Sequence, residues 1–104
     1  MSITVHLYYH GTNGKARDFA EEMEANGLAN TIRAQDGCER YEYFYSLTDP
    51  NRVLLIDTWR DQESLDRHHS SEAMKTLARL REEYGLVRTI ECYVPAEDIP
   101  VDRP

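Results

Sequence analysis

The segment Val53-Leu-Leu-Ile56 limits the possible folds more than any other part of this 104-residue chain. It follows a turn sequence, and its composition is typical of a strand. Because successive side chains of a strand point to opposite faces of a sheet, these four apolar residues occupy both faces. A sheet that contains this segment therefore needs apolar cover on both sides.

Three further segments have strand character. Residues 3–10 alternate between one apolar and one more polar face. Residues 39–47 carry aromatic side chains at alternate positions, and the turn at residues 48–52 joins them to the apolar run as an antiparallel hairpin. Residues 86–94 form the last predicted strand.

Apolar residues at helical spacing fill the two intervals between these strands. Before the hairpin they predict a helix over residues 16–25 and a shorter helical piece over residues 28–32. After the hairpin they predict two helices, with Asp61 as the first N-cap and Ser70 or Ser71 as the second.

The element order predicts an α+β, ferredoxin-like βαββαβ fold, in which helices cover one face of a four-stranded antiparallel sheet. The helices suffice for one face only, so we expect a second subunit to cover the other. We assign residues 1–95 to this single domain. Residues 96–104 form an acidic, proline-containing tail for which we expect no regular structure.

Charge and composition exclude several classes of protein. The net charge of −7 and the pI near 5.0 disfavour binding to nucleic acid or to anionic membranes. No apolar run approaches the ~18 residues of a membrane span, and no secretory signal is evident, so a cytoplasmic protein is expected. With only Cys38 and Cys92, we expect free thiols and no cysteine metal site.

Residues 37–73 contain a spaced set of residues that resembles the signature of the antibiotic-biosynthesis monooxygenase family. The matching positions are Gly37-Cys38, Tyr41, Ser46-Leu47, Asp49-Pro50-Asn51-Arg52, Asp57-Thr58-Trp59, Leu65 and His68. The resemblance implies a dimeric α+β barrel, in which two sheets pack face to face as a homodimer. It also implies a pocket inside each subunit, where a small phenolic, hydroquinone or polyketide-like aromatic substrate is oxidised by O₂ without a cofactor or metal.

Two residues are candidate catalytic bases. Strand parity places Asp57 on the same face as Trp59, and a carboxylate beside an apolar pocket has a raised pKa. His68 follows Leu65 by three residues on a predicted helix, which turns it toward the sheet. The alternative is structural: Trp59 fills the core, Asp57 is hydrogen-bonded at an edge, and His68 bonds the backbone at a helix end.

Four further residues complete the predicted site. Trp59 would stack on the substrate ring, and Leu7, Leu55 and Leu65 would shape the cavity. Members of related families that degrade haem use asparagine, tryptophan and histidine at places that align with Leu7, His68 and Ala78, so haem cleavage is disfavoured.

Comparison with members that oxidise anthrone-type polyketides gives a partial match. Their asparagine, tryptophan, tyrosine and arginine align with Leu55, Trp59, Leu65 and Arg79, so the tryptophan and the arginine match, although Arg79 lies off the apolar stripe of its helix. Two alternatives to a monooxygenase remain. One is an isomerase of a small phosphorylated carbonyl compound, which requires an Arg or Lys phosphate clamp in the pocket, and the other is a non-catalytic, ligand-binding dimer.

Overall fold

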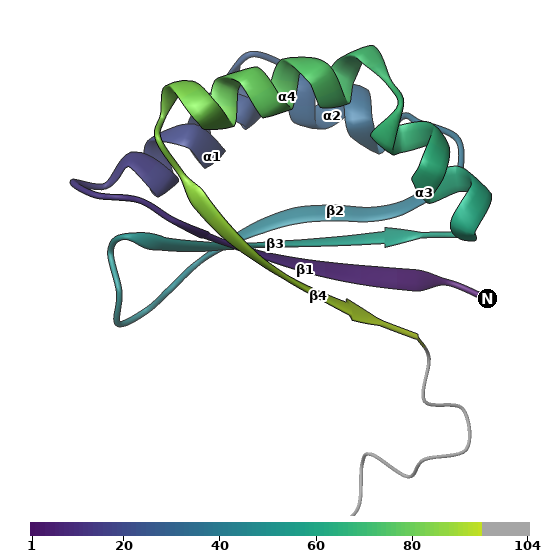
Figure 1. Ribbon diagram of the computed structural model, residues 1–104, viewed down its shortest axis with the longest axis horizontal. Helices are drawn as coiled ribbons and strands as arrows, with labels where there is room; N and C mark the ends of the chain where they lie inside the picture. The colour runs from purple at the N-terminus through teal and green to yellow at the C-terminus, as the bar shows by residue number, and fades with distance from the viewer. Residues whose placement is uncertain (95–104) are drawn as a thin grey trace, which may run out of the picture.

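The computed structural model describes residues 1–94, in which four strands form one antiparallel sheet in the order β2-β3-β1-β4. The strands are β1 (Ile3–His10), β2 (Cys38–Tyr45), β3 (Arg52–Trp59) and β4 (Val87–Tyr93). The helices are α1 (Lys15–Ala25), α2 (Leu28–Arg33), α3 (Gln62–His69) and α4 (Glu72–Glu83). All these helices lie on one side of the sheet (Figure 1), which confirms the predicted ferredoxin-like α+β fold.

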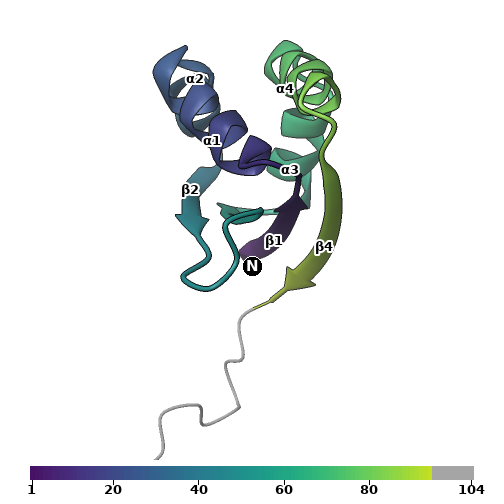
Figure 2. The same ribbon diagram turned by 90° about the vertical axis from the view of Figure 1, so that its left-hand side faces the viewer.

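The helices form two groups above the sheet. Helices α1 and α2 lie above β2, whereas α4 lies above the opposite edge, where β4 runs (Figure 2). The α4 helix packs against α1 and α2, so the helical layer is continuous. The β2 strand ends at Tyr45, two residues before the predicted end, because Ser46 Oγ accepts a hydrogen bond from Asp49 N and begins the turn.

Local sequence signals set the helix ends. The carboxylate of Asp61 accepts a hydrogen bond from Ser64 N at 2.8 Å, and Ser71 Oγ accepts one from Met74 N at 3.2 Å. At Gly37, φ is 87°, and an added Cβ would collide with the Ser64 side chain. A glycine is therefore required where the chain enters β2 beneath α3.

Strand parity in β3 follows the prediction. Val53, Leu55, Asp57 and Trp59 are buried beneath the helices, while the residues between them are partly exposed. Aromatic and aliphatic side chains from the helices complete this core, among them Phe19, Met23 and Ile32, all fully buried.

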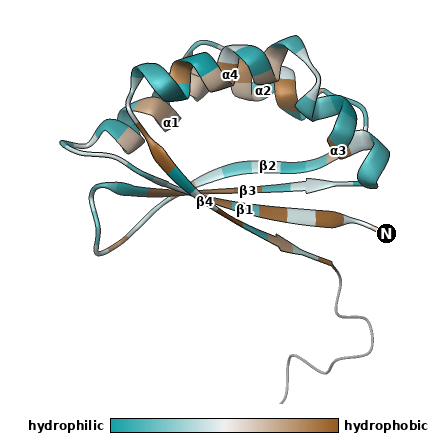
Figure 3. Ribbon diagram, viewed as in Figure 1, coloured by the Kyte–Doolittle hydropathy of each residue, from teal (hydrophilic) through white to brown (hydrophobic). Residues whose placement is uncertain are grey.

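The other face of the sheet is not covered by any helix of residues 1–94. It carries Tyr8, Leu54 and Ile56, whose backbones are paired across β1 and β3. Hydrophobic residues occur in the strands as well as in the helices (Figure 3). The edge strand β4 is exposed along its whole length, with Val87 at 68% and Tyr93 at 45%. None of the helices in residues 1–94 has the length and apolar character of a membrane span.

Candidate active site

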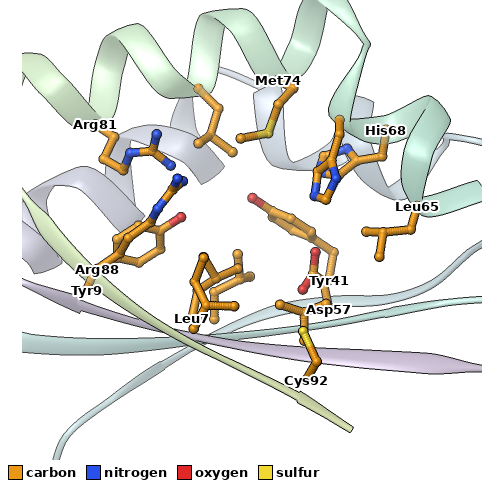
Figure 4. Close-up of a pocket in the computed structure, with 15 residues that line it drawn as sticks. Leu7, Tyr9, Tyr41, Asp57, Leu65, His68, Met74, Arg81, Arg88 and Cys92 are labelled. Atoms are coloured by element: carbon orange, nitrogen blue, oxygen red, sulfur yellow. The ribbon is translucent and has the colours of Figure 1, made fainter. Parts of the chain in front are cut away.

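A cavity of about 340 Å³ lies between the sheet and helices α3 and α4 (Figure 4). A volume of this size is typical of sites for small ligands. Its walls are mostly apolar, with a few polar and charged groups. The lining residues are Val5, Leu7, Tyr9, Tyr41, Leu55, Asp57, Leu65, His68, His69, Met74, Leu77, Arg81, Arg88, Ile90 and Cys92.

The sheet presents its part of the lining in three rows, which follow from the pairing of β3, β1 and β4. The first row contains Asp57, Val5 and Cys92, and the second contains Leu55, Leu7 and Ile90. The third row contains Val53, Tyr9 and Arg88, of which Val53 does not line the cavity. The floor of the cavity therefore carries the carboxylate of Asp57 at one end, apolar side chains in the middle and the cation of Arg88 at the other end.

Asp57 is buried, with only 3% of its surface exposed. Its Oδ2 accepts a hydrogen bond from Trp59 Nε1 at 3.0 Å, whereas Oδ1 is shielded from solvent and has no partner within residues 1–94. Burial raises the pKa of Asp57 to about 6, although the hydrogen bond from Trp59 opposes that rise. The side chain is thus a carboxylate at neutral pH with one unoccupied acceptor atom.

Trp59 connects the two candidate bases. Its indole donates to Asp57, and the ring of His68 stacks on it with centroids 4.5 Å apart and planes inclined by 20°. Burial, and to a smaller extent His69, lowers the pKa of His68 to about 4. At neutral pH His68 is therefore an uncharged imidazole, and Asp57 is the stronger base.

A hydrogen-bond chain determines which nitrogen of His68 carries the proton. Ser71 Oγ donates its proton to the carbonyl oxygen of His68 at 2.6 Å, so it can only accept from Gln35 Nε2, at 3.1 Å. This orientation of the amide turns Gln35 Oε1 toward His68 Nδ1, at 2.8 Å. An amide oxygen only accepts, so Nδ1 is protonated and Nε2 keeps a free lone pair.

The predicted site residues occupy two layers. Asp57, His68, Leu7, Leu55 and Leu65 line the cavity together. Trp59 is fully buried and is not among the lining residues, because the ring of His68 lies against it. In this structure the indole contacts Asp57 and His68, two of the polar side chains that line the cavity.

Several lining residues were not predicted from the sequence. Tyr9 shares the apolar face of residues 3–10, and Tyr41 stands opposite Asp57 in the β2–β3 pair. Arg81 follows Leu77 by four residues, so its helical spacing with an apolar residue was an available signal. Arg88 alternates with Ile90 on an exposed edge strand, where periodicity does not show which face is covered.

Two further positions that were compared with related families, Arg79 and Ala78, lie outside the cavity lining. Arg79 is exposed on α4, which agrees with its position off the apolar stripe of that helix, and Ala78 is partly buried. Cys38 and Cys92 are free thiols. Within residues 1–94, no cluster of three or more His, Cys, Asp or Glu side chains is arranged to hold a metal ion.

Comparison with known proteins assigns the family. A family model described as antibiotic biosynthesis monooxygenase matches residues 2–80. The chain belongs to this family. No curated protein sequence matches the chain.

Solved structures share the fold of this family member. A protein from Deinococcus radiodurans, provisionally described as an antibiotic biosynthesis monooxygenase, is 18% identical with a TM-score of 0.80; the match covers 99% of this chain and 100% of that chain. SnoaB, a cofactor-independent oxygenase from Streptomyces nogalater, is 16% identical with a TM-score of 0.78, covering 96% and 98%. A protein from Pseudomonas aeruginosa is 25% identical with a TM-score of 0.70, covering 88% and 89%.

Proposed function

We propose that this protein is a monooxygenase that oxidises a small phenolic, hydroquinone or polyketide-like aromatic compound with O₂ and without a cofactor. The observation that carries the proposal is Asp57 Oδ1, a carboxylate oxygen in a mostly apolar cavity that has no hydrogen-bond partner within residues 1–94. The family membership and the described function of SnoaB support the same reaction class.

The reaction begins with a proton transfer. Asp57 Oδ1 accepts a proton from the hydroxyl or activated carbon of the substrate, while the hydrogen bond from Trp59 Nε1 holds the other carboxylate oxygen in place. A pKa of about 6 keeps Asp57 ionised at neutral pH and still makes it a stronger base than an exposed carboxylate. His68, neutral with Nδ1 protonated, offers the Nε2 lone pair as a hydrogen-bond acceptor or a secondary base.

The substrate anion then reduces O₂. The substrate loses two hydrogens, both from a methylene carbon or one each from a ring carbon and a hydroxyl. That carbon gains one oxygen atom as a carbonyl, and the second oxygen atom leaves as water. The substrate supplies all four electrons, so no other reductant is needed. The protein contributes proton removal, orientation of the ring and exclusion of water by Leu7, Leu55 and Leu65.

The proposed active form is a homodimer that joins the uncovered sheet faces. Tyr8, Leu54 and Ile56 would then be removed from water, as the apolar run on both faces of β3 requires. The exposed apolar residues Val87 and Tyr93 of β4 extend this face to the edge of the sheet. Analytical ultracentrifugation of the wild type and an Ile56→Lys variant checks this assembly, and a monomeric wild type would contradict it.

An oxygen-uptake assay with ¹⁸O₂ tests the reaction. The purified, chelator-treated protein is assayed against hydroquinones, naphthols and anthrones, beside Asp57→Asn and the exposed control Asp66→Asn. We expect one labelled atom in the product and a rate well above autoxidation, lost in Asp57→Asn and kept in Asp66→Asn. Uptake equal to the autoxidation control across the panel would contradict the proposal.

A second candidate function is favoured by two lining residues. Arg81 and Arg88 are the type of cations that an isomerase of a small phosphorylated carbonyl compound requires. In that reaction Asp57 would move a proton between adjacent carbons without consuming O₂. Proton exchange into a phosphorylated carbonyl substrate, followed by NMR in D₂O without oxygen, distinguishes the two.

A further inference from the structure

The end of the cavity opposite Asp57 contains two arginines and a tyrosine. Arg88 on β4 is paired with Tyr9 on β1, and Arg81 reaches the same place from α4. These three residues lie at one end of the cavity, and Asp57, Leu65 and His68 lie at the other (Figure 4). Burial raises the pKa of Tyr9, and both arginines oppose that rise, which is consistent with their closeness to the phenol.

Both arginines lack an anionic partner within residues 1–94. Within residues 1–94, Arg33, Arg40, Arg60 and Arg67 form ion pairs with carboxylates, whereas Arg81 and Arg88 are among the arginines that form none. The chain has 19 acidic and 12 basic residues, so carboxylates are abundant. Arg17, Arg52 and Arg79 also lack an ion pair among the described residues, but Arg81 and Arg88 differ from them because they line the cavity.

Arg81 is the more strongly constrained of the two. Its Nη1 is shielded from solvent and has no hydrogen-bond partner within residues 1–94. A guanidinium donor without a partner is costly away from water, and a carboxylate or phosphate is the group that its planar fork fits best. Arg88 is exposed on the edge strand, so its guanidinium can contact an anion bound to Arg81 from the solvent side of the cavity.

We propose that the substrate carries an anionic group, a carboxylate or a phosphate, which Arg81 and Arg88 bind at the end of the cavity away from Asp57. Tyr9 donates its hydroxyl proton to the same group. This inference rests on the proposed function only in taking Asp57 as the base. Binding of an anion by the two arginines can be measured without any catalytic turnover.

The sheet register sets the spacing of the two groups. Asp57 pairs with Val5, and Arg88 pairs with Tyr9, four residues farther along β1. Four residues of an antiparallel strand span roughly 14 Å between Cα atoms, and the side chains shorten this distance. A substrate with its hydroxyl and its anionic group at opposite ends of two fused rings fits this spacing, whereas one with adjacent groups does not.

Calorimetric titration without oxygen tests the anion site. The probes are 6-hydroxy-2-naphthoate, its neutral match 2-naphthol, the isomer 1-hydroxy-2-naphthoate with adjacent groups, and 2-naphthyl phosphate. The variants are Arg81→Gln, Arg88→Gln and the double variant, with Arg79→Gln as the control because Arg79 is exposed on the same helix. Thermal unfolding and 2-naphthol binding confirm that each variant is folded.

We expect 6-hydroxy-2-naphthoate to bind on the order of tenfold or more tightly than 2-naphthol, and more tightly than the isomer. The double variant should lose this preference and still bind 2-naphthol, while Arg79→Gln should keep it. Tighter binding of the phosphate identifies phosphate as the anionic group, and tighter binding of 6-hydroxy-2-naphthoate identifies a carboxylate. Equal affinity for charged and neutral probes, or a preference that survives in the double variant, would overturn the proposal.

These binding outcomes are independent of oxygen chemistry. If oxygen uptake fails but the arginine-dependent preference is observed, the anion site stands and the monooxygenase proposal does not. If neutral substrates are oxidised and the preference for charged probes is absent, the monooxygenase proposal stands and the anion site does not.

Discussion

The two ends of the cavity differ in how completely their polar groups are partnered. At the acidic end, Trp59, Gln35 and Ser71 hold the side chains of Asp57 and His68 through bonds that leave one acceptor atom free on each. At the basic end, Arg81 and Arg88 have no ion pair within residues 1–94, and the strand that carries Arg88 is exposed. The polar side chains of the first end are held in fixed orientations by their hydrogen bonds, whereas the two arginines of the second end are not held by ion pairs within residues 1–94.

The largest expected effect comes from removing the proposed base. Asp57→Asn keeps the size of the side chain but cannot accept a proton, so oxygen uptake should fall by about 100-fold or more. In the wild type, the rate should fall as pH drops through about 6, where Asp57 becomes protonated. A pH–rate profile of both proteins checks this, and an unchanged profile in Asp57→Asn would assign the base elsewhere.

The pH dependence of the free energy of unfolding distinguishes the contributions of Asp57 and His68. The pKa of Asp57 is raised from 3.8 to about 6 in the folded protein, so its ionisation lowers stability by up to about 3 kcal/mol as pH rises from 4 to 6. The pKa of His68 is lowered from 6.5 to about 4, so its contribution lowers stability as pH falls through the same range. The two contributions oppose each other in the wild type.

Single variants should expose each contribution in urea denaturation between pH 4 and 6.5. In Asp57→Asn, stability should rise with pH, because the His68 contribution is no longer opposed by Asp57. In His68→Gln, stability should fall more steeply as pH rises from 4 to 6 than in the wild type, because the Asp57 contribution is no longer opposed by His68. Parallel curves for the two variants would show that neither residue is perturbed as described.

A moderate effect is expected from the residue that orients His68. Gln35→Leu removes the acceptor at Nδ1, so His68 can adopt the tautomer that blocks Nε2, and we expect a loss of activity on the order of tenfold. Nitrogen-15 shifts of the His68 ring report the tautomer directly. Gln35→Glu should restore both the tautomer and most of the activity, and Gln62→Leu on the exposed side of α3 serves as the control.

The smallest effect is expected at Trp59. Trp59→Phe keeps a ring beneath His68 but removes the hydrogen bond to Asp57 Oδ2, which favours the carboxylate. The pKa of Asp57 should rise further, and the acidic limb of the pH–rate profile should move up by on the order of one pH unit. A downward shift would mean that the indole does not stabilise the charged form.

Local sequence signals were sufficient for most of the fold. The alternation of residues 3–10, the hairpin turn and the N-cap at Asp61 each act within a few residues, and the structure confirms them. Of the two residues predicted for the second cap, Ser70 and Ser71, the structure shows Ser71. The parity of β3 likewise predicted that Asp57 and Trp59 share a face. For the site, the family resemblance implied a pocket between the sheet and the helices, and Leu7, Leu55, Asp57, Leu65 and His68, which were predicted to form it, line one cavity.

The sequence by itself therefore determined the order of the elements and the faces of the central strands, because alternation and helical spacing are local properties. Only the tertiary structure decided that Trp59 lies behind His68, that Gln35 sets the tautomer, and that Arg81 and Arg88 meet at Tyr9. These contacts join residues from separate elements, and their geometry depends on how α2, α3 and α4 pack against the sheet. No local pattern records that arrangement, since it follows from packing of the whole domain.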